Sequence, residues 1–435
     1  MRRALFATLI AVVVSLPLAG SRVPGVGLRI GLVAMLVPAA MAALYVIRER
    51  LWDFASPALV AAGLLTLSTI VSLPIASDSH ATDLTVATVA GFGIVAAIVA
   101  VCGSAQIAVI LEVLSLVAGV IAALSLSDIG SLTSQLGGSV VSGRLQGLFS
   151  QPNELGGFCA LTLPIAIIAA RYAHSTLRRL ALTVSALTIT GALALSLSRG
   201  AFLGAFVGLV MIVVLLPDAR KAMTRIVLAV VVAAVAAAAL LPQSDAVLGI
   251  LTTRLQSITS GAAAPYDERP QIWAEALRLA DRHPLFGIGP GEYQNKTLAP
   301  GSRLYANPVE HAHNLVLTVL AEQGFIGVVA LVAMGAALVL TAARLMTRSR
   351  NLSGPTATTI RWTTAAPLAA LAATAAHGLI DMPLRNPILN VAVWIVFGCA
   401  AAGPLARRMK STTTPTATEP EREPARKEVQ SGPTK

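Results

Sequence analysis

The sequence predicts an all-α integral membrane protein with about twelve transmembrane helices and one long extracytoplasmic loop that contains short helices. Of its 435 residues, 55% are hydrophobic and only 12% are charged. Soluble domains carry about 45–50% apolar and about 25% charged residues. A spanning helix needs about 20 apolar residues, and the chain has enough for roughly twelve. This composition excludes a soluble domain with a large core.

Apolar runs bounded by charged or turn residues mark the individual spans. The predicted spans are residues 4–20, 25–46, 56–76, 83–102, 105–125, 154–171, 179–197, 200–217, 224–242, 318–343, 362–380 and 386–405. The first run follows Met1, Arg2 and Arg3 and resembles a signal peptide. Because no clear small-residue cleavage site follows it, we interpret it as an uncleaved anchor.

Basic residues in the short loops predict the orientation of the chain. With the N-terminus in the cytoplasm, most Lys and Arg residues near the spans fall on the inner side. The basic residues of the short outer segments are Arg22, Arg29, Arg144, Arg199 and Arg385. An even number of spans returns the C-terminus to the cytoplasm. The formal net charge of +11 therefore reflects the positive-inside bias and does not indicate nucleic-acid binding.

A long outer loop covers residues 243–317, about 75 residues where packed helices are usually joined by 2–8. We expect Asp267 to cap a helix over about 268–282, with Trp273 on its apolar side. A stretch rich in Pro and Gly over 283–291 should end this helix in turns. Loops of this length are usually functional or disordered.

These features divide the chain into three parts. Residues 1–125 form the N-terminal helices, and residues 126–405 form a core that includes the loop 243–317. The tail 406–435 consists largely of Thr, Pro, Glu and Lys, and we expect it to be disordered in the cytoplasm because it has almost nothing apolar to bury. The cysteines Cys102, Cys159 and Cys399 lie in apolar stretches and are interpreted as small buried side chains.

Glu112 is the clearest charged residue in the predicted membrane interior, midway through the fifth span. An intramembrane acid is a functional candidate. The alternative is a carboxyl group hydrogen-bonded to a neighbouring helix, which we favour because no basic intramembrane partner is evident. Ion-coupled transporters need such groups near the midplane, and their scarcity here argues against a transporter.

Polar side chains gather instead in five sequence-distant segments of the predicted outer face. They are Arg144, Gln151 and Asn153; Ser198, Arg199 and Gly200; Asp267, Glu268, Arg269 and Trp273; His311, His313, Asn314, Glu322 and Gly324; and His377, Asp381 and Arg385. Arginine forks bind phosphate oxygens bidentately, and histidine can take a proton from a hydroxyl group at neutral pH. Together they predict a site for an anionic, membrane-tethered substrate.

Each residue taken singly has a plainer interpretation. Outer arginines contact lipid headgroups, Trp273 serves as an interfacial anchor or packing residue, and His313 serves as a capping residue. The spacing of Gly287, Gly289 and Gly291 differs from a dinucleotide fingerprint. His311-x-His313 alone is a weak zinc signal, so we expect neither a metal nor another cofactor. Only the combination of segments favours a site.

The order of five motifs resembles the O-antigen ligase / Wzy-type polymerase superfamily. The motifs are Arg-x-x-Gly-x-Phe-x-x-Pro-Asn over 144–153, Ser-Arg-Gly over 198–200, Arg-x-x-x-Trp over 269–273, His-Pro-Leu-Phe-Gly-Ile-Gly-Pro-Gly over 283–291, and His-Asn-Leu-Val-Leu-x-x-x-x-Glu-x-Gly over 313–324. The resemblance covers roughly residues 140–400. The earlier spans are similar only in hydropathy.

The resemblance implies a metal-independent, inverting glycosyl transfer at the outer face of a bacterial inner membrane, on a fold related to lipid-dependent glycosyltransferases. The donor would be a glycan on undecaprenyl diphosphate, and the acceptor would be lipid A-core, another carrier-linked glycan or protein Ser/Thr. By position, His313 would be the base, and Arg199, Arg269 and Arg144 would bind the diphosphate. The supporting residues would be Asn153, Asn314, Glu322 and Trp273.

Three functional hypotheses therefore stand. The first is an outer-face glycosyltransferase, most similar to an O-antigen ligase, with a polysaccharide polymerase or a protein O-oligosaccharyltransferase as the alternatives within the superfamily. The second is a transporter or flippase for a lipid-linked glycan, which should show ionisable groups along a midplane path and repeat symmetry. The third is a non-catalytic member of a secretion assembly.

Overall fold

A computed structural model describes residues 1–23, 29–49, 56–77, 79–127, 144–220, 268–302, 304, 309–348, 353–382 and 384–402. Its regular elements are α1 (Arg2–Val14), α2 (Ile30–Arg48), α3 (Pro57–Ser72), α4 (Ser79–Val101), α5 (Ser104–Ser127), α7 (Pro152–Tyr172), α8 (Thr176–Ser196), α9 (Arg199–Leu215), α12 (Arg269–Arg282), α13 (Tyr293–Leu298), α14 (Leu315–Arg348), α15 (Gly354–Gly378) and α16 (Pro387–Ala402), with short 3-10 turns at Leu16–Leu18, Leu73–Ile75 and Pro217–Ala219. Within these ranges the only extended pairing is an isolated bridge between Arg22 and Arg29.

The all-helical, membrane-type architecture is confirmed for the described part of the chain. Each predicted span there coincides with a helix, and seven of these helices are long and apolar enough to cross a membrane, with α9 and α16 as shorter apolar helices. The total of twelve crossings stays a prediction. The predicted span 224–242, the residues 243–267 and the tail 406–435 lie outside the described residues.

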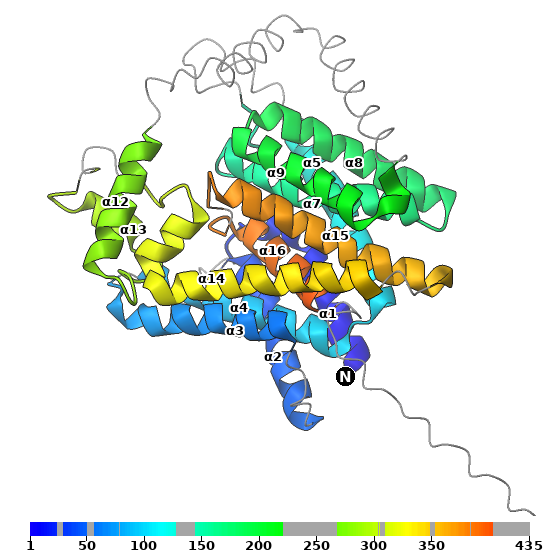
Figure 1. Ribbon diagram of the computed structural model, residues 1–435, viewed down its shortest axis with the longest axis horizontal. Helices are drawn as coiled ribbons and strands as arrows, with labels where there is room; N and C mark the ends of the chain where they lie inside the picture. The colour runs from blue at the N-terminus through cyan, green and yellow to red at the C-terminus, as the bar shows by residue number, and fades with distance from the viewer. Residues whose placement is uncertain are drawn as a thin grey trace, which may run out of the picture.

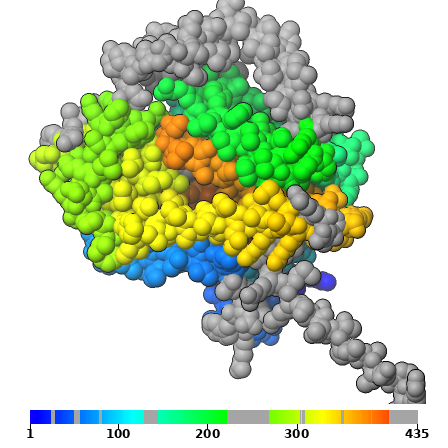
Figure 2. Space-filling view, in the orientation of Figure 1, coloured from blue at the N-terminus to red at the C-terminus, as the bar shows by residue number. Residues whose placement is uncertain are grey.

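The helices pack into a bundle whose centre is α7 and α16 (Figure 1). α7 is buried without interruption from Leu155 to Ala170 and packs against α8, α9 and α15. Gly204 and Gly208 of α9 face α15, where a larger side chain would meet backbone of Ala373 and Ala369. Small residues let helices approach closely where lipid supplies no hydrophobic driving force. The surface is hollowed between α14 and α15 (Figure 2).

Glu112 has a basic partner, which corrects the sequence-based interpretation. A carboxylate oxygen of Glu112 on α5 lies 3.7 Å from a guanidinium nitrogen of Arg178. Arg178 is in the first turn of α8, a helix that packs along α5. The sequence showed no basic intramembrane partner for Glu112, but the long arginine side chain reaches the acid from the helix end, as basic side chains do near membrane surfaces.

α14 is interrupted inside the predicted span 318–343, which the sequence predicts as one continuous helix. Gly324 has φ 66° and ψ −161°, a conformation outside the helix. The carbonyls of Ala321 and Glu322 accept hydrogen bonds from the N–H groups of Ile288 (2.9 Å) and Gly289 (3.0 Å). The segment 283–291 thus provides the donors that the interrupted helix lacks, as a membrane-embedded backbone requires.

The same segment also accepts hydrogen bonds from the C-terminal side of the break. Phe325 N–H donates to the Pro284 carbonyl at 2.8 Å. Gly287 has φ +67°, and a Cβ there would clash with the backbone of Glu322, while one on Gly324 would clash with the Leu285 carbonyl. The close backbone contact with the break therefore explains Gly287 of this motif, whereas a Cβ on Gly289 would meet Ala76 after α3. We call the segment 283–291 the α14 strap.

α12 and α13 lie at one end of the bundle, over a small core of their own (Figure 1). The buried members of that core are Ile272, Ala276, Leu279, Ile288, Tyr293, Leu304, Ala312 and Ala321. The Tyr293 hydroxyl donates to the Ile272 carbonyl at 2.7 Å. Glu292 accepts hydrogen bonds from the Ser77 N–H (2.7 Å) and hydroxyl (3.0 Å) at the end of α3, which fixes this unit to the bundle.

The start of α12 differs slightly from the prediction. The helix begins at Arg269 with Glu268 in the N-cap position and no side-chain cap, whereas Asp267, the expected cap, lies outside the described residues. Pro270 occupies the first turn, where its missing N–H costs nothing. Arg269 is therefore held at the first helical position with a fixed backbone.

Candidate functional site

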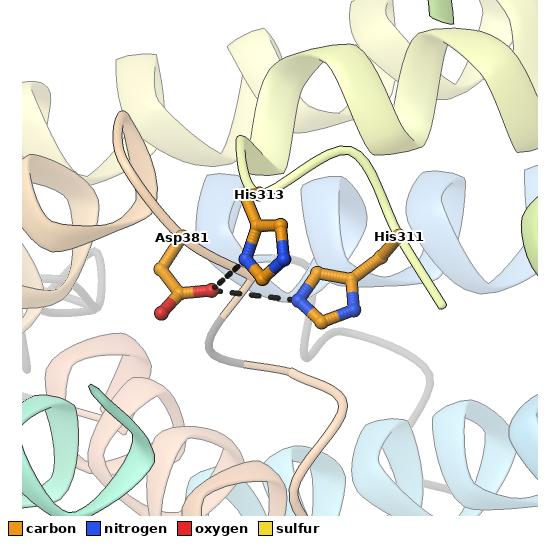
Figure 3. A group of neighbouring side chains, drawn as sticks. All are labelled: His311, His313 and Asp381. Carbon is orange, nitrogen blue, oxygen red and sulfur yellow. Dashed lines mark hydrogen bonds and ion pairs between the residues drawn. The ribbon is translucent and has the colours of Figure 1, made fainter. Parts of the chain in front are cut away.

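Asp381 lies at the centre of a cluster of histidines at the end of the bundle that carries α12 and α13. The turn after α15 supplies Asp381, and the segment before α14 supplies His311 and His313 (Figure 3). His313 Nδ1 lies 3.1 Å and His311 Nε2 lies 3.4 Å from the same carboxylate oxygen, Oδ1. Asp381 is 6% exposed. Two segments about seventy residues apart thus form one buried network.

The charges of this cluster follow from its burial and its hydrogen bonds. Burial alone would raise the pKa of the Asp381 carboxyl, but hydrogen bonds from His311 and His313 and the adjacent His377 outweigh it and hold the pKa well below its ordinary value. Burial lowers the pKa of His311, and the bond to Asp381 only partly offsets that effect. Asp381 is therefore an anion, and His311 a neutral donor, at neutral pH.

The hydrogen bond to Asp381 sets the tautomer of His313. An ionised carboxylate only accepts, so the proton of His313 is assigned to Nδ1 and the lone pair to Nε2. This is the arrangement that a third group imposes on a general base. The side chain of His313 is partly exposed, at 22%, while its partner is buried. His313 is thus oriented from one side and accessible from the other.

His377 and the two arginine segments adjoin this cluster. His377 Nε2 lies 3.9 Å from the second oxygen of Asp381. Gly200, next to Arg199 at the start of α9, packs on the His377 ring so closely that a Cβ there would lie 3.0 Å from Cδ2. Arg269 is near enough for its charge to act on His377. The Arg199 segment therefore contacts the cluster through Gly200, and Arg269 lies within electrostatic range of it.

Arg144 and Asn153 are also brought together, and they hold the turn before Arg199. Arg144 donates through Nε to the Ser196 carbonyl (2.9 Å) and through a terminal nitrogen to Asn153 Oδ1 (2.5 Å). Leu145 N–H donates to the Leu195 carbonyl at 2.9 Å. These bonds connect the segment before α7 to the last turn of α8. The sequence predicted Arg144 as a phosphate ligand and did not predict these hydrogen bonds between the two segments.

Backbone strain marks two of these positions. Among the described residues, the non-glycine residues with positive φ are Leu197 at 48° and His313 at 47°. Leu197 ends α8 immediately before the Ser198 cap of α9, and His313 is the candidate base itself. A left-handed conformation of such residues costs about 1–3 kcal/mol and persists where the surroundings over-determine it, which is common at functional sites.

The remaining predicted residues support the backbone of the cluster. Asn314 donates to the Leu379 carbonyl at 2.9 Å and accepts from the Leu317 N–H at 3.0 Å, so it links the start of α14 to the turn after α15. Glu322 is buried and pairs with Arg385. Trp273 packs against the small core under α12, and its indole N–H is buried without a hydrogen-bond partner among the described residues.

The donor set of the cluster is also the one that could hold a metal ion. Within the described ranges, His311, His313 and Asp381 form the group of ligand-type side chains whose donor atoms all lie within 4.8 Å of one another. Two imidazole nitrogens and a carboxylate oxygen are suitable ligands for zinc. The contacts of 3.1 and 3.4 Å are hydrogen-bond distances and explain the geometry without an ion. The absence of a metal stays a prediction.

Sequence reasoning placed Asp381, His377 and Arg385 on the outer face but gave them no role. The partners of Asp381 in His311 and His313 and the partner of Arg385 in Glu322 are more than 60 residues away, so nothing local distinguished them. It missed Glu154 and Asn386, which are hydrogen-bonded to each other at 3.0 Å. A signal for Glu154 was present: Gln151 and Glu154 have capping-box spacing at the start of α7, which predicts an inward-turned carboxylate.

Comparison with known families supports the resemblance found in the motifs. Residues 184–332 match the family model described as O-antigen ligase. The match extends from α8 through α9, α12 and α13 into α14, and it contains Arg199, Arg269 and His313 but not Asp381. The predicted similarity to the O-antigen ligase and Wzy-type superfamily is thereby confirmed for this region. A comparison with curated proteins finds no match.

Proposed function

We propose, from the O-antigen ligase domain that the chain carries over residues 184–332, that this protein is a membrane glycosyltransferase. It moves a glycan from undecaprenyl diphosphate to an acceptor at the outer face of a bacterial inner membrane, most similarly to an O-antigen ligase. The observation that carries the proposal is the hydrogen bond from His313 to the buried, anionic Asp381 beside the Arg199 and Arg269 segments.

His313 acts as the general base. Its Nε2 takes the proton of the acceptor hydroxyl as the hydroxyl oxygen attacks the anomeric carbon of the donor glycan. The bond from that carbon to the diphosphate oxygen breaks, and the electron pair leaves with undecaprenyl diphosphate. A single displacement of this kind inverts the anomeric configuration. Asp381 stabilises the imidazolium that forms as the proton is transferred.

Arg199 and Arg269 stabilise the departing diphosphate. Guanidinium groups bind phosphate oxygens through two parallel hydrogen bonds and stay charged beside lipid. Both residues begin helices, α9 and α12, and the partial positive charge of a helix N-terminus adds to the charge of each arginine. With two fixed cations on the leaving group, the proposed reaction uses no metal ion.

Arg144 has a positioning role in this proposal. Its bonds to Ser196 and Asn153 hold the Leu197 turn, and that turn sets where Arg199 begins α9. Loss of Arg144 should therefore act on donor binding through Arg199.

The proposal places the N- and C-termini in the cytoplasm and the site outside, following the distribution of Lys and Arg. A site at that end of the bundle would meet a diphosphate at the headgroup level while the polyprenyl chain stays in the bilayer.

A deletion strain tests the function. Cell-envelope extracts are blotted for surface polysaccharide, with plasmid-borne wild type and His313→Ala. For a ligase, long carrier-linked glycan accumulates, the mature lipid-linked product is lost, and only the wild type restores it. Single repeat units on the carrier would instead identify a polymerase. A polysaccharide profile unchanged by the deletion, with protein glycosylation also unchanged, would contradict the proposal.

Reconstituted vesicles separate the transferase from a flippase. The proposed enzyme forms a new glycosidic bond when donor and acceptor are on the same side of the vesicle, and Arg199→Lys weakens donor binding because lysine keeps the charge but loses the fork. Translocation of carrier-linked glycan without a new bond would refute the transferase and support the flippase. Near-full donor binding by Arg199→Lys would refute a bidentate contact.

A further inference from the structure

A large polar cavity is lined by segments that adjoin the histidine cluster in sequence, and the proposed reaction does not use it. Its volume is about 550 Å³, within the range of about 300–1,000 Å³ that small-molecule sites occupy. It lies among residues 17–21 and Arg29 near the N-terminus, the start of α7, helix α13, Glu310 and the start of α16. Segments far apart in the sequence thus line it.

Amides and carboxylates dominate the polar lining. The amide side chains are Gln151, Gln294, Asn295 and Asn386, and the carboxylates are Glu154 and Glu310. Amides both donate and accept hydrogen bonds, and carboxylates accept. Sugar hydroxyls, which donate one hydrogen bond and accept two, match this combination. Diphosphate oxygens do not, because they only accept and would face two carboxylates of like charge.

The basic residues of the lining do not change this balance. Arg385 contributes to the wall, but its guanidinium is paired with the buried carboxylate of Glu322. Arg29 is the other basic residue of the lining, and the lining also holds the two carboxylates Glu154 and Glu310. The cavity therefore has no excess of positive charge with which to hold a diphosphate, in contrast to the Arg199 and Arg269 segments.

The inner wall of the cavity is built rigidly. Glu154 Oε2 accepts hydrogen bonds from the Ser150 N–H (3.0 Å), the Gln151 N–H (3.2 Å) and Asn386 Nδ2 (3.0 Å). Asn386 Oδ1 accepts from the Ile388 N–H at 2.9 Å and so caps α16. One wall thus consists of two helix starts locked together, while Gln294 and Glu310 on the rim are exposed.

The chain itself connects this cavity to the proposed base. Glu310 precedes His311 and lies three residues before His313, and Arg385 lies four residues after Asp381. A ligand that fills the cavity therefore lies next to the segments that hold the His313–Asp381 pair.

We propose that this cavity is a saccharide subsite, in which the side chains of Gln294 and Glu310 bind sugar hydroxyls next to the reacting centre. The inference rests on the proposed function for its place in the reaction. The saccharide comes either from the donor glycan or from a glycan acceptor, which share the chemistry that the lining recognises.

Binding measured without turnover tests this proposal. The full chain in lipid nanodiscs is mixed with one of two soluble oligosaccharides, and saturation-transfer NMR reports contact with the protein. One probe is the oligosaccharide released by mild acid from the cells' carrier-linked glycan. The other is released in the same way from their lipid-linked envelope acceptor. The variants are Gln294→Ala with Glu310→Ala, and Lys296→Ala as the matched control on the same short helix.

We expect at least one probe to bind, and the double variant to bind it about tenfold more weakly, since a hydrogen bond to a charged group contributes about one factor of ten or more. Lys296→Ala, at an exposed residue outside the cavity lining, should bind like the wild type. The probe that responds identifies the source as donor or acceptor.

Binding of neither probe, or binding that the double variant leaves unchanged, would overturn the saccharide subsite. His313→Ala separates this result from the proposed function, because it should abolish transfer while it leaves oligosaccharide binding intact. Intact binding with transfer retained in His313→Ala would refute the base and leave the subsite standing.

Discussion

Two acids, Glu112 and Asp381, meet basic partners in opposite surroundings. Glu112 lies 3.7 Å from an Arg178 side chain that is 64% exposed, whereas Asp381 is buried and shared by His311 and His313 at hydrogen-bond distance. Glu112 attracted attention in the sequence because it interrupts an apolar span. Asp381 did not, because it sits in an ordinary turn. A carboxylate acquires chemical importance from the groups that surround it, more than from its depth in a hydropathy profile.

The contrast also separates two kinds of electrostatic effect. An ion pair whose basic partner is largely exposed at a helix end contributes about 0–1 kcal/mol, since solvent reaches that partner and both side chains lose entropy. A buried carboxylate that accepts hydrogen bonds fixes the tautomer and direction of its partner. The Asp381 network should therefore control activity, and the Glu112 pair should not.

Asp381→Asn should have the largest effect of the changes that leave His313 in place. The asparagine keeps the size of the side chain but removes the charge that fixes the His313 tautomer, so we expect transfer activity to fall about 10- to 100-fold, as for orienting partners elsewhere. Initial rates in proteoliposomes measure this. The control is Asp381→Glu, which should recover part of the rate. Equal activity of Asp381→Asn and wild type would show that the pair is not functional.

Gly324→Ala should disturb the backbone conformation at the break in α14, which positions Glu322 and the α14 strap. Alanine at φ 66° costs about 1–3 kcal/mol, and the new methyl group also meets the Leu285 carbonyl. We expect a several-fold lower yield of folded protein and a lower midpoint of thermal unfolding in detergent. Gly335→Ala, in the same helix with open space around the new Cβ, should be neutral or stabilising. Normal stability of Gly324→Ala would contradict the strap.

The stability conferred by Asp381 should depend on pH. Its pKa is lower in the folded protein than the ordinary value of 3.8, so its contribution is complete above that value and is lost as the pH falls towards the folded pKa. The difference in thermal midpoint between wild type and Asp381→Asn should therefore be constant above about pH 5 and shrink below about pH 4. A difference that grows on acidification would reverse the assigned sign.

Glu112→Gln should have the smallest effect. Loss of the pair with Arg178 should change the free energy of unfolding by less than about 1 kcal/mol and leave transfer activity within about twofold of wild type. Both quantities are measured in the same proteoliposome preparation as for Asp381→Asn. An activity loss as large as that of Asp381→Asn would restore Glu112 as a functional intramembrane acid.

The sequence predicted the helices well and the network poorly, for physical reasons. Apolar runs near 20 residues reveal spans such as α5 and α7 because the bilayer imposes that length. The break at Gly324 was not predictable, because the strap that supplies its hydrogen bonds lies over 283–291. The family motifs identified His313, Arg199 and Arg269 as candidates. Asp381 remained unassigned because its bond to His313 spans 68 residues and depends on the packing of α14 against α15.

The proposed reaction depends on His313 as the base of a glycosyl transfer. The most direct test is the single-turnover rate of glycan transfer by purified wild type and His313→Ala, with donor affinity measured separately on the same samples. Loss of the base should lower the rate about 10²–10⁴-fold and leave donor affinity within about twofold of wild type. A rate that stays within about tenfold of wild type, or a loss explained by weaker donor binding, would contradict it.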